Sequence, residues 1–384
     1  MSVILVATVL FGTAVGSFLN VCIWRLPRSG LFVGRPRRSF CPSCATAIAW
    51  HDNIPLLSWF LLGGRCRTCR FPVSARYFLV EALTALVFVL VAQRYLFPGP
   101  PSPGDWGAFL AVSVLAAATV VASFIDLELR IIPDQITVRG MMLAPFVALC
   151  VPALHPRQGS ISDLLAAWSR GLESLAASIP ETLTKGTPLT VLTLLAAALF
   201  FVSGLYGYAL YWKIVHPREA KPLRDGIIGG ILMGAAGGMA CSNVLRPDLV
   251  TTPSVHSFWA ALAGMLAGSA LVFMVGVIGT KLLRKPAMGF GDVKLMGLLG
   301  AFTGWSGVVA GFFIACFLGS AVGIFLWIRH GSRYMPFGPF LAMGCFSMLL
   351  WPETFASLLD WYLRLFSWPP LVSALPYALS LRCS

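Results

Sequence analysis

The chain has 384 residues, of which 58% are hydrophobic and 11% are charged, and its formal net charge is +13. A soluble domain carries about 25% charged residues, so this composition excludes an ordinary water-soluble protein and predicts a lipid bilayer as the main solvent. The positive charge is not evidence for a nucleic-acid partner, because nine arginines fall in the segment 25–76 beside a single acidic residue, Asp52. Basic loops between apolar segments are typical of the cytosolic side of membrane proteins.

The first apolar segment, 1–24, is predicted to be a transmembrane helix over residues 3–24. Arg25 and Arg28 follow the apolar run and no basic residue precedes it, which is the reverse of a secretory signal peptide. We therefore expect this helix to remain in the protein with its N-terminus outside. The segment 25–76 is then cytosolic.

The cytosolic segment contains two C-x-x-C pairs with 21 residues between them. Four thiolates at this spacing can converge on one tetrahedral zinc ion, and four protein ligands leave no open position for hydrolytic chemistry. Disulfides or redox-active C-x-x-C sites are the alternative, which a cytosolic location disfavours. The sequence therefore predicts a small cytosolic domain with a structural zinc ion held by Cys41, Cys44, Cys66 and Cys69.

Further spans follow from runs of about 20 apolar residues, the length needed to cross a bilayer. A shorter run, 293–304, is predicted to be a short or re-entrant helix that ends at Gly304-Trp305, and basic loops alternate correctly only if it crosses. The fold class is therefore an all-α polytopic membrane protein with about 8–10 transmembrane helices. The remaining spans are predicted at 77–97, 106–125, 136–153, 189–212, 227–244, 257–280, 306–328 and 336–352.

Two carboxylates are expected at the cytosolic ends of predicted helices. Asp126 ends the span 106–125, and Asp292 follows Gly289-Phe290-Gly291, where the glycines permit close approach and non-helical backbone. When two carboxylates share a site, one retains a proton while the other can activate water. The pattern predicts aspartic acid–base hydrolysis of an amide. The alternative for each residue is a position at the interface or pairing with Arg130 or Lys294.

Other acidic residues have simpler interpretations. Asp134 is expected to cap the helix 136–153, and Glu128 is expected to be solvated. Glu81 is placed in the first turn of the helix 77–97, where the helix dipole favours a carboxylate. It is also a candidate contact for the active site or for a methyl donor.

The chain is therefore divided into six predicted segments. The segment 154–256 is read as an insertion with a non-cytosolic loop and two helices, and 353–384 as a Trp-rich interfacial tail. The others are the helix 1–24, the zinc-binding domain 25–76, the helices 77–153 with the first catalytic Asp, and the helices 257–352 with the G-x-G-D motif.

Several blocks together resemble the bacterial prepilin peptidases, the GxGD-type aspartic proteases of type IV pilus and type II secretion systems. The most specific is the combination of the two cysteine pairs with Asn53-Ile54-Pro55-Leu56-Leu57-Ser58-Trp59. The other blocks are Gly16–Val21 with Arg25–Pro27, Asp126 through Asp134, Gly289–Lys294 and Pro336–Ala342.

The resemblance implies a bifunctional enzyme of the bacterial cytoplasmic membrane. The family cuts the basic leader of prepilins or pseudopilins after a glycine on the cytosolic face, and the catalytic pair maps to Asp126 and Asp292. It then methylates the new N-terminal amine with S-adenosylmethionine, a cofactor that rests on the resemblance alone. The length of 155–256 between the aspartate blocks departs from the expected pattern. No feature specifies a particular pilin or an oligomeric state.

Two other functions are compatible with the aspartates taken alone. A proton-coupled transporter also uses intramembrane carboxylates, but a zinc domain with the Asn53–Trp59 block offers transport no evident advantage. A catalytically silent assembly protein is disfavoured because both aspartates are present.

Overall fold

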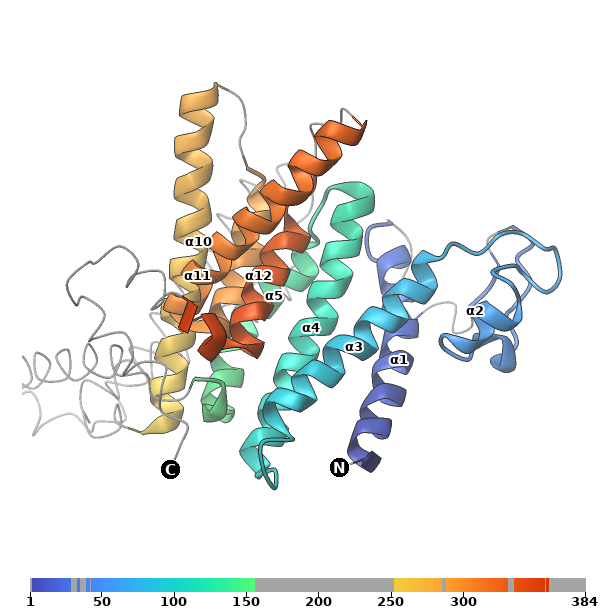
Figure 1. Cartoon of the computed structure of the whole chain (residues 1–384), viewed down its shortest axis with the longest axis horizontal. Coiled ribbons are helices and arrows are strands. Elements are labelled where there is room, and N and C mark those ends of the chain that lie inside the picture. The colour runs from blue at the N-terminus through green and yellow to red at the C-terminus, as the bar shows by residue number, and fades with distance from the viewer. Residues whose placement is uncertain are drawn as a thin grey trace, which may run out of the picture. The chain divides into compact units, whose positions relative to one another are not determined.

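In the computed structural model the described residues are 2–28, 33–34, 39–41, 43–155, 252–284, 288–330, 335–355 and 357–358. Across these ranges the chain is helical, and only isolated β-bridges occur (Figure 1). The predicted spans 189–212 and 227–244, most of the segment 154–256 and most of the tail 353–384 lie outside the described residues. The helices are α1 (Ser2–Arg25), η1 (Trp50–Asn53), α2 (Leu57–Leu61), α3 (Arg76–Tyr95), α4 (Pro103–Leu129), α5 (Asp134–Cys150), η2 (Pro152–Leu154), α10 (Pro253–Leu283), α11 (Phe290–His330) and α12 (Gly338–Leu350).

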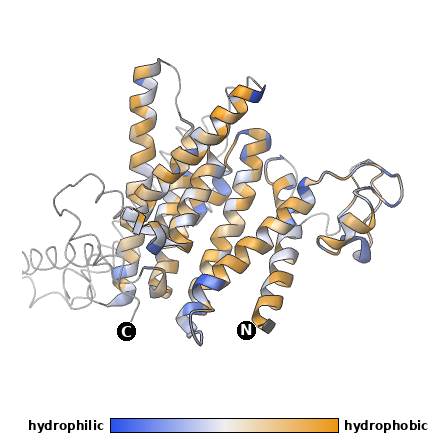
Figure 2. Ribbon diagram, in the orientation of Figure 1, coloured by the Kyte–Doolittle hydropathy of each residue, from blue (hydrophilic) through white to orange (hydrophobic). Residues whose placement is uncertain are grey.

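Five helices of the described part, α1, α3, α4, α10 and α11, are long and apolar enough to cross a membrane. They are coloured hydrophobic along most of their length in Figure 2. Large apolar side chains point away from the protein on these helices: Leu10 is 64% exposed and Phe317 is 76% exposed. Only lipid can stabilise such a surface, so the prediction of an all-α, multi-pass membrane protein is confirmed.

The chain divides into two compact units. The first comprises Met1–Met141 and Ala261–Leu358, and the second comprises Met142–Ala260 and Leu359–Ser384. In the second unit, the rings of Phe146 and Phe258 pack in a T-shaped arrangement. Every candidate site below lies within the first unit. The six-segment division predicted from the sequence stays a prediction.

Helices α1 and α3 are in direct backbone contact. A Cβ atom added to Gly12 would lie 2.8 Å from Cα of Ala85, and one added to Gly16 would lie 2.6 Å from Cα of Glu81. This G-x-x-x-G spacing is a common way to bring two helices close together inside a membrane. The close approach places Glu81 against the N-terminal helix.

Replacing Gly16 with Ala is expected to destabilise the protein by about 1–3 kcal/mol, the usual cost of forcing a methyl group into a filled site. The new methyl group would meet backbone atoms of α3, so the helices must separate. Thermal unfolding in detergent measures the effect. Gly99→Ala is the matched control, because a Cβ there meets no atom within 4 Å. Equal unfolding midpoints for the two variants would contradict the close packing.

The long helix α11 is two helices joined at Gly304. This residue has φ 71° and ψ 174°, a conformation that side chains disfavour. The predicted short helix that ends at Gly304-Trp305 is therefore confirmed. In its first half, a Cβ on Gly300 would lie 2.1 Å from the carbonyl oxygen of Gly264 in α10. Helix α12 packs against the second half of α11 and also against α4, which brings Gly338 to the end of α4.

Candidate active site and metal centre

Asp126 lies in the last turn of α4 and is buried, with 7% of its surface exposed. The backbone N–H of Gly338, at the start of α12, donates to Asp126 Oδ2 over 3.1 Å. A Cβ on Gly338 would lie 2.7 Å from the same oxygen, so a larger residue there would displace the carboxylate. The Pro336–Ala342 block thus supplies a hydrogen-bond donor to the first predicted catalytic residue.

Asp292 lies in the first turn of α11, and its backbone N–H donates to the carbonyl oxygen of Gly289 over 3.1 Å. Gly289 and Gly291 were expected to allow close approach and non-helical backbone. Gly289 lies outside the helix, Gly291 lies inside it, and neither has a positive φ. The close approach is found at Gly291. A Cβ on Gly291 would lie 3.1 Å from Cβ of Ile132.

The two aspartates are brought to one place by three segments of the first unit. Ile132, in the turn between α4 and α5, lies beside Gly291 and also within 3.4 Å of a Cβ placed on Gly338. The charges of Asp126 and Asp292 are near enough to interact. The end of α4, the start of α11 and the start of α12 therefore meet around two carboxylates.

Lys294 and Asp134 form an ion pair beside this site. Asp134 was predicted to cap a helix starting at residue 136, but it is the first residue of α5. Its carboxylate joins α5 to α11. Sequence reasoning missed this pair because 160 residues separate its members.

The four predicted metal ligands converge. Their Sγ atoms all lie within 4.8 Å of one another, and Cys41 Sγ is 3.7 Å from Cys69 Sγ. Tetrahedral zinc with Zn–S bonds of about 2.3 Å requires sulfurs about 3.8 Å apart. The cysteines are free thiols rather than disulfides. The donor set therefore fits a closed, structural zinc site.

The thiols differ in their readiness to ionise. Hydrogen bonds with the side chain and the backbone of Thr46 lower the pKa of Cys44 to about 6. A backbone hydrogen bond at Phe71 lowers the pKa of Cys69, but desolvation and its hydrogen bonds with the other thiols outweigh it and raise that pKa to about 11. Cysteine binds a metal ion as the thiolate. The lowered pKa of Cys44 favours this form and therefore favours binding of a cation.

Each C-x-x-C pair sits in the same small hairpin, repeated with an offset of 25 residues. An antiparallel bridge joins Phe40 to Ala47 in the first hairpin and Arg65 to Pro72 in the second. The duplication is not evident in the sequence, because little besides the cysteines recurs between the two copies.

The hairpins also share their turn geometry. Ala45 and Arg70, each directly after the second cysteine of its pair, are left-handed with φ of 55° and 58°. The N–H of Cys41 donates to the Thr46 carbonyl over 3.0 Å, and the N–H of Cys66 donates to Phe71 over 2.9 Å. The described residues from 39 to 75, called the zinc module below, are therefore built on two equivalent knuckles.

An ion pair connects the segment between the two knuckles to the second knuckle. Arg67 donates from Nε and a terminal nitrogen to the two carboxylate oxygens of Asp52, over 2.8 Å and 2.6 Å. This fork holds the pKa of Asp52 below its usual value. A carboxylate so paired is a poor proton acceptor, which assigns Asp52 a structural role.

The zinc module is attached to the membrane helices through Glu81. The N–H of Leu56 donates to Glu81 Oε2 over 2.7 Å, and Leu56 holds a left-handed φ of 62°, which is unusual for a branched side chain. The expected position of Glu81 in the first helical turn is wrong: α3 starts at Arg76 with no acidic residue in its first turn. The buried Glu81 is therefore held by the Leu56 contact and not by the helix dipole.

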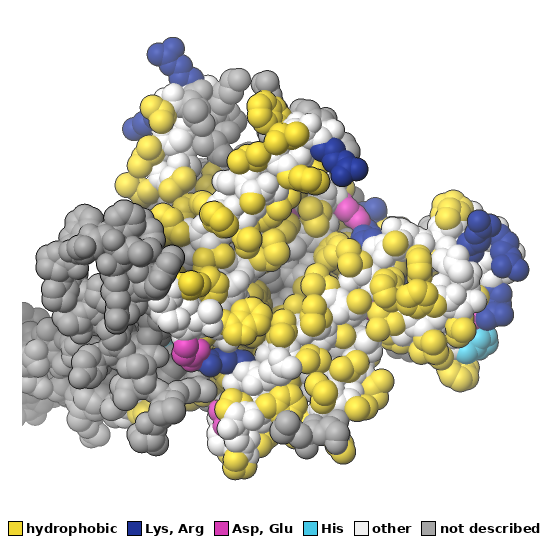
Figure 3. Space-filling view, viewed as in Figure 1, with side chains coloured by type: hydrophobic (Ala, Val, Ile, Leu, Met, Phe, Trp, Pro, Cys, Tyr) yellow, Lys and Arg dark blue, Asp and Glu magenta, His cyan; other side chains and the backbone are white. Residues whose placement is uncertain are grey.

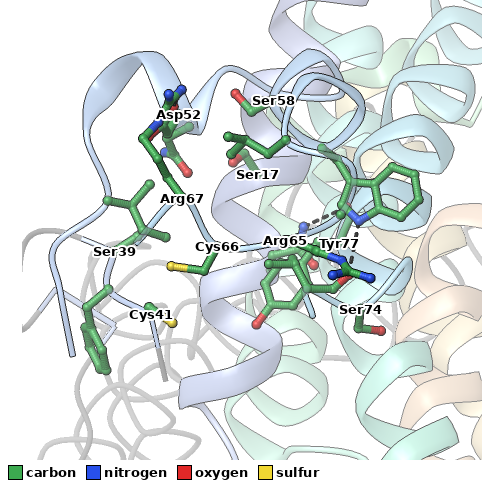
Figure 4. Close-up of a pocket in the computed structure, with 18 of the residues that line it drawn as sticks. Ser17, Ser39, Cys41, Asp52, Ser58, Arg65, Cys66, Arg67, Ser74 and Tyr77 are labelled. Carbon is green, nitrogen blue, oxygen red and sulfur yellow. Dashed lines mark hydrogen bonds and ion pairs between the residues drawn. The ribbon is translucent and has the colours of Figure 1, made fainter. Parts of the chain in front are cut away.

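A cavity of about 650 Å³ lies between the zinc module, α1 and α3 (Figure 4). Glu81 lines it, together with polar groups of α1 and α3 that include Ser17, Asn20 and Tyr77. Asn20 Nδ2 donates to the Tyr77 carbonyl, while its buried Oδ1 has no protein partner. The cavity is large enough for a cofactor and offers both charged and apolar walls.

Glu128 is exposed, as the sequence predicted, and it also lines the cavity. It pairs with Arg76 at the start of α3. Glu128 follows Asp126 by two residues in α4, and residues two apart point to nearly opposite sides of a helix. The last turn of α4 therefore presents one carboxylate to Gly338 and another to the cavity.

Comparison with known proteins places these features in context. The bacterial peptidase A24 N-terminal domain matches residues 10–95, and the type IV leader peptidase family matches residues 227–324, a segment that includes Asp292. No solved structure matches the chain significantly.

Curated relatives align along most of the chain. A prepilin leader peptidase/N-methyltransferase of Aeromonas salmonicida strain A449 is 30% identical over 380 residues, covering 92% of each chain. The protein of the same name from Aeromonas hydrophila is 29% identical over 382 residues, covering 93% of each. The type 4 prepilin-like proteins leader peptide-processing enzyme of Escherichia coli O78:H11 is 28% identical, covering 87% of this chain and 88% of its own.

Proposed function

This chain belongs to the prepilin leader peptidase/N-methyltransferase family, and from that premise we propose that it cleaves the basic leader of type IV prepilins or pseudopilins with Asp126 and Asp292. It then methylates the new N-terminus. The enzyme lies in the bacterial cytoplasmic membrane with the zinc module in the cytosol, because the Arg-rich segment is expected on that side.

The observation that carries cleavage is the meeting of Asp126 and Asp292 at the ends of two apolar helices. One carboxylate takes a proton from water, whose oxygen attacks the scissile carbonyl carbon. The protonated partner gives its proton to the leaving amine as the C–N bond breaks. The Gly338 N–H keeps Asp126 oriented throughout.

The test is to incubate the purified protein with a synthetic prepilin in detergent and to determine the masses of the products by mass spectrometry. A pilin shortened by its leader is the expected result. Absence of a shortened product with folded, zinc-loaded enzyme would contradict the proposal and favour a transport or assembly function.

The zinc ion is proposed to be structural. The four cysteines would hold it and keep the two knuckles together, which maintains the cavity wall and the Leu56–Glu81 contact. It is not proposed to act on the substrate, because four thiolates leave no open coordination position.

The cavity beside Glu81 is the proposed methylation site. Bound there, S-adenosylmethionine would supply an electrophilic methyl group. Glu81 and Glu128 offer carboxylates that would attract the sulfonium charge and accept the proton that the substrate ammonium must lose before its nitrogen can attack. The new N-terminus would form at Asp126, and only the last turn of α4 separates that position from the cavity.

The two activities should separate by mutation. Glu81→Gln is expected to lower methyl transfer at least 10-fold, because the amide carries no charge, while cleavage persists. Asp292→Asn should do the reverse and still methylate a mature, unmethylated pilin. The measurement supplies pre-cut pilin and labelled methyl donor to each variant in detergent. Complete loss of methyl transfer in folded Asp292→Asn protein would show that both activities use the aspartates.

A further inference from the structure

Helix α2 and Ile54, three residues before it, carry an apolar surface that the rest of the zinc module does not cover. Ile54, Leu57, Phe60 and Leu61, which together form the α2 face, are 39%, 51%, 61% and 73% exposed. No charged residue occurs between Asp52 and Arg65. A contiguous group of large apolar side chains on a small polar module marks a surface with a partner.

Several backbone N–H groups of this segment are hydrogen-bonded within the protein, as a low-dielectric environment requires. The N–H of Ser58 donates to Ile54 over 3.0 Å, and the N–H of Leu62 donates to Ser58 over 3.0 Å. The N–H of Ile54 donates to the Ser58 hydroxyl over 2.9 Å, and the N–H of Leu56 donates to the Glu81 carboxylate. Backbone that enters the membrane boundary must satisfy its hydrogen bonds within the protein.

The α2 face is continuous with the surface of a membrane helix. The ring of Phe60 packs edge-on against Phe78, in the first turn of α3, with centroids 4.9 Å apart. Leu79, the next residue of α3, is 55% exposed. Figure 3 shows hydrophobic side chains running together across this region, with Lys and Arg side chains at the outer edge of the module. The apolar surface of α3 therefore continues onto α2.

Charge at the edge of the module supports the same partner. Arg70 follows the apolar segment and is exposed, whereas Arg65 lines the cavity. Aromatic and aliphatic residues beside arginines are the composition of helices that lie in the membrane interface, where arginine is drawn to anionic headgroups.

From this arrangement we infer that α2 lies in the interfacial layer of the bilayer, with Ile54, Leu57, Phe60 and Leu61 against the acyl chains and Arg70 at the phosphates. The zinc module is then fixed to the membrane at three points: at α1, at α3 and along α2.

The test uses the full-length protein in vesicles of phosphatidylcholine and phosphatidylglycerol, without pilin. Leu61→Trp adds a tryptophan fluorophore to the α2 face. The emission of this added tryptophan is the emission of the variant minus that of the wild-type protein. Lipids brominated near the headgroup end of the acyl chains should quench at least half of this added emission, and aqueous iodide should quench little. Ser43→Trp, on the exposed turn of the first knuckle, is the control and should show the opposite pattern.

Phe60→Trp provides a second reading of the same face, and zinc content verifies that each variant is folded. Quenching of positions 60 and 61 by iodide but not by brominated lipid would overturn the inference. Protection from both quenchers would also overturn it, because a second copy of the chain or another protein segment would then cover α2.

Discussion

Replacing Asp292 with Asn should reduce prepilin cleavage by about 10²–10⁴-fold, the typical contribution of one acid–base group. Asn has nearly the same shape, but it cannot exchange the proton that the mechanism requires. The start of α11 should stay intact, because its close contact with Ile132 involves Gly291. Product mass after incubation with a synthetic prepilin gives the rate.

Asp126→Asn should have an effect of the same size. Its amide oxygen can still accept from the Gly338 N–H, so the contact between α4 and α12 is kept. Asp134→Asn is the matched control, since it removes a neighbouring carboxylate that pairs with Lys294. It should retain most activity. Substantial cleavage by either Asp126→Asn or Asp292→Asn would disprove the catalytic pair.

The double variant Cys41→Ser, Cys44→Ser should lose its zinc, falling from one ion per chain to none. Two remaining thiolates cannot replace a four-thiolate site, whose zinc affinity is worth about 10–16 kcal/mol in small zinc domains. The first knuckle should then unfold, so that the backbone beside the arginines of the segment 25–76 can enter the active site of trypsin. Metal analysis and limited proteolysis measure the two effects.

Cys150→Ser controls for general thiol effects, because Cys150 lies outside the quartet. This variant should keep its zinc and its resistance to trypsin. Fresh wild-type protein without zinc, and with disulfides mapped between the knuckles, would instead place the module in an oxidising compartment.

Features that depend on local sequence were predicted well. The apolar run 3–24 became α1, Ser2–Arg25, and the run 336–352 became α12, Gly338–Leu350. The break at Gly304 was also visible, because glycine interrupts an apolar run there. Asp126 and Asp292 were singled out because a carboxylate beside a membrane span is costly and rare, and their catalytic role stays a prediction.

Features that depend on tertiary contact were not predicted. Glu81 was assigned to the helix dipole, whereas a backbone N–H from the zinc module decides its position. The role of Gly338 as a donor to Asp126 depends on the packing of α12 against α4. Neither contact leaves a periodic or compositional signal in the chain.

The last turn of α4 has a kinetic consequence. Asp126 and Glu128 are two residues apart on opposite sides of a helix that is about 10–12 Å across with its side chains. If cleavage and methylation take place at these two sites as proposed, a freshly cut N-terminus would reach the cavity by moving around this turn while the rest of the pilin stays bound. Cleavage and methylation would then be processive, with unmethylated pilin staying on the enzyme between the two steps. The fraction of pilin that leaves fully methylated should therefore be independent of how much substrate competes for the enzyme.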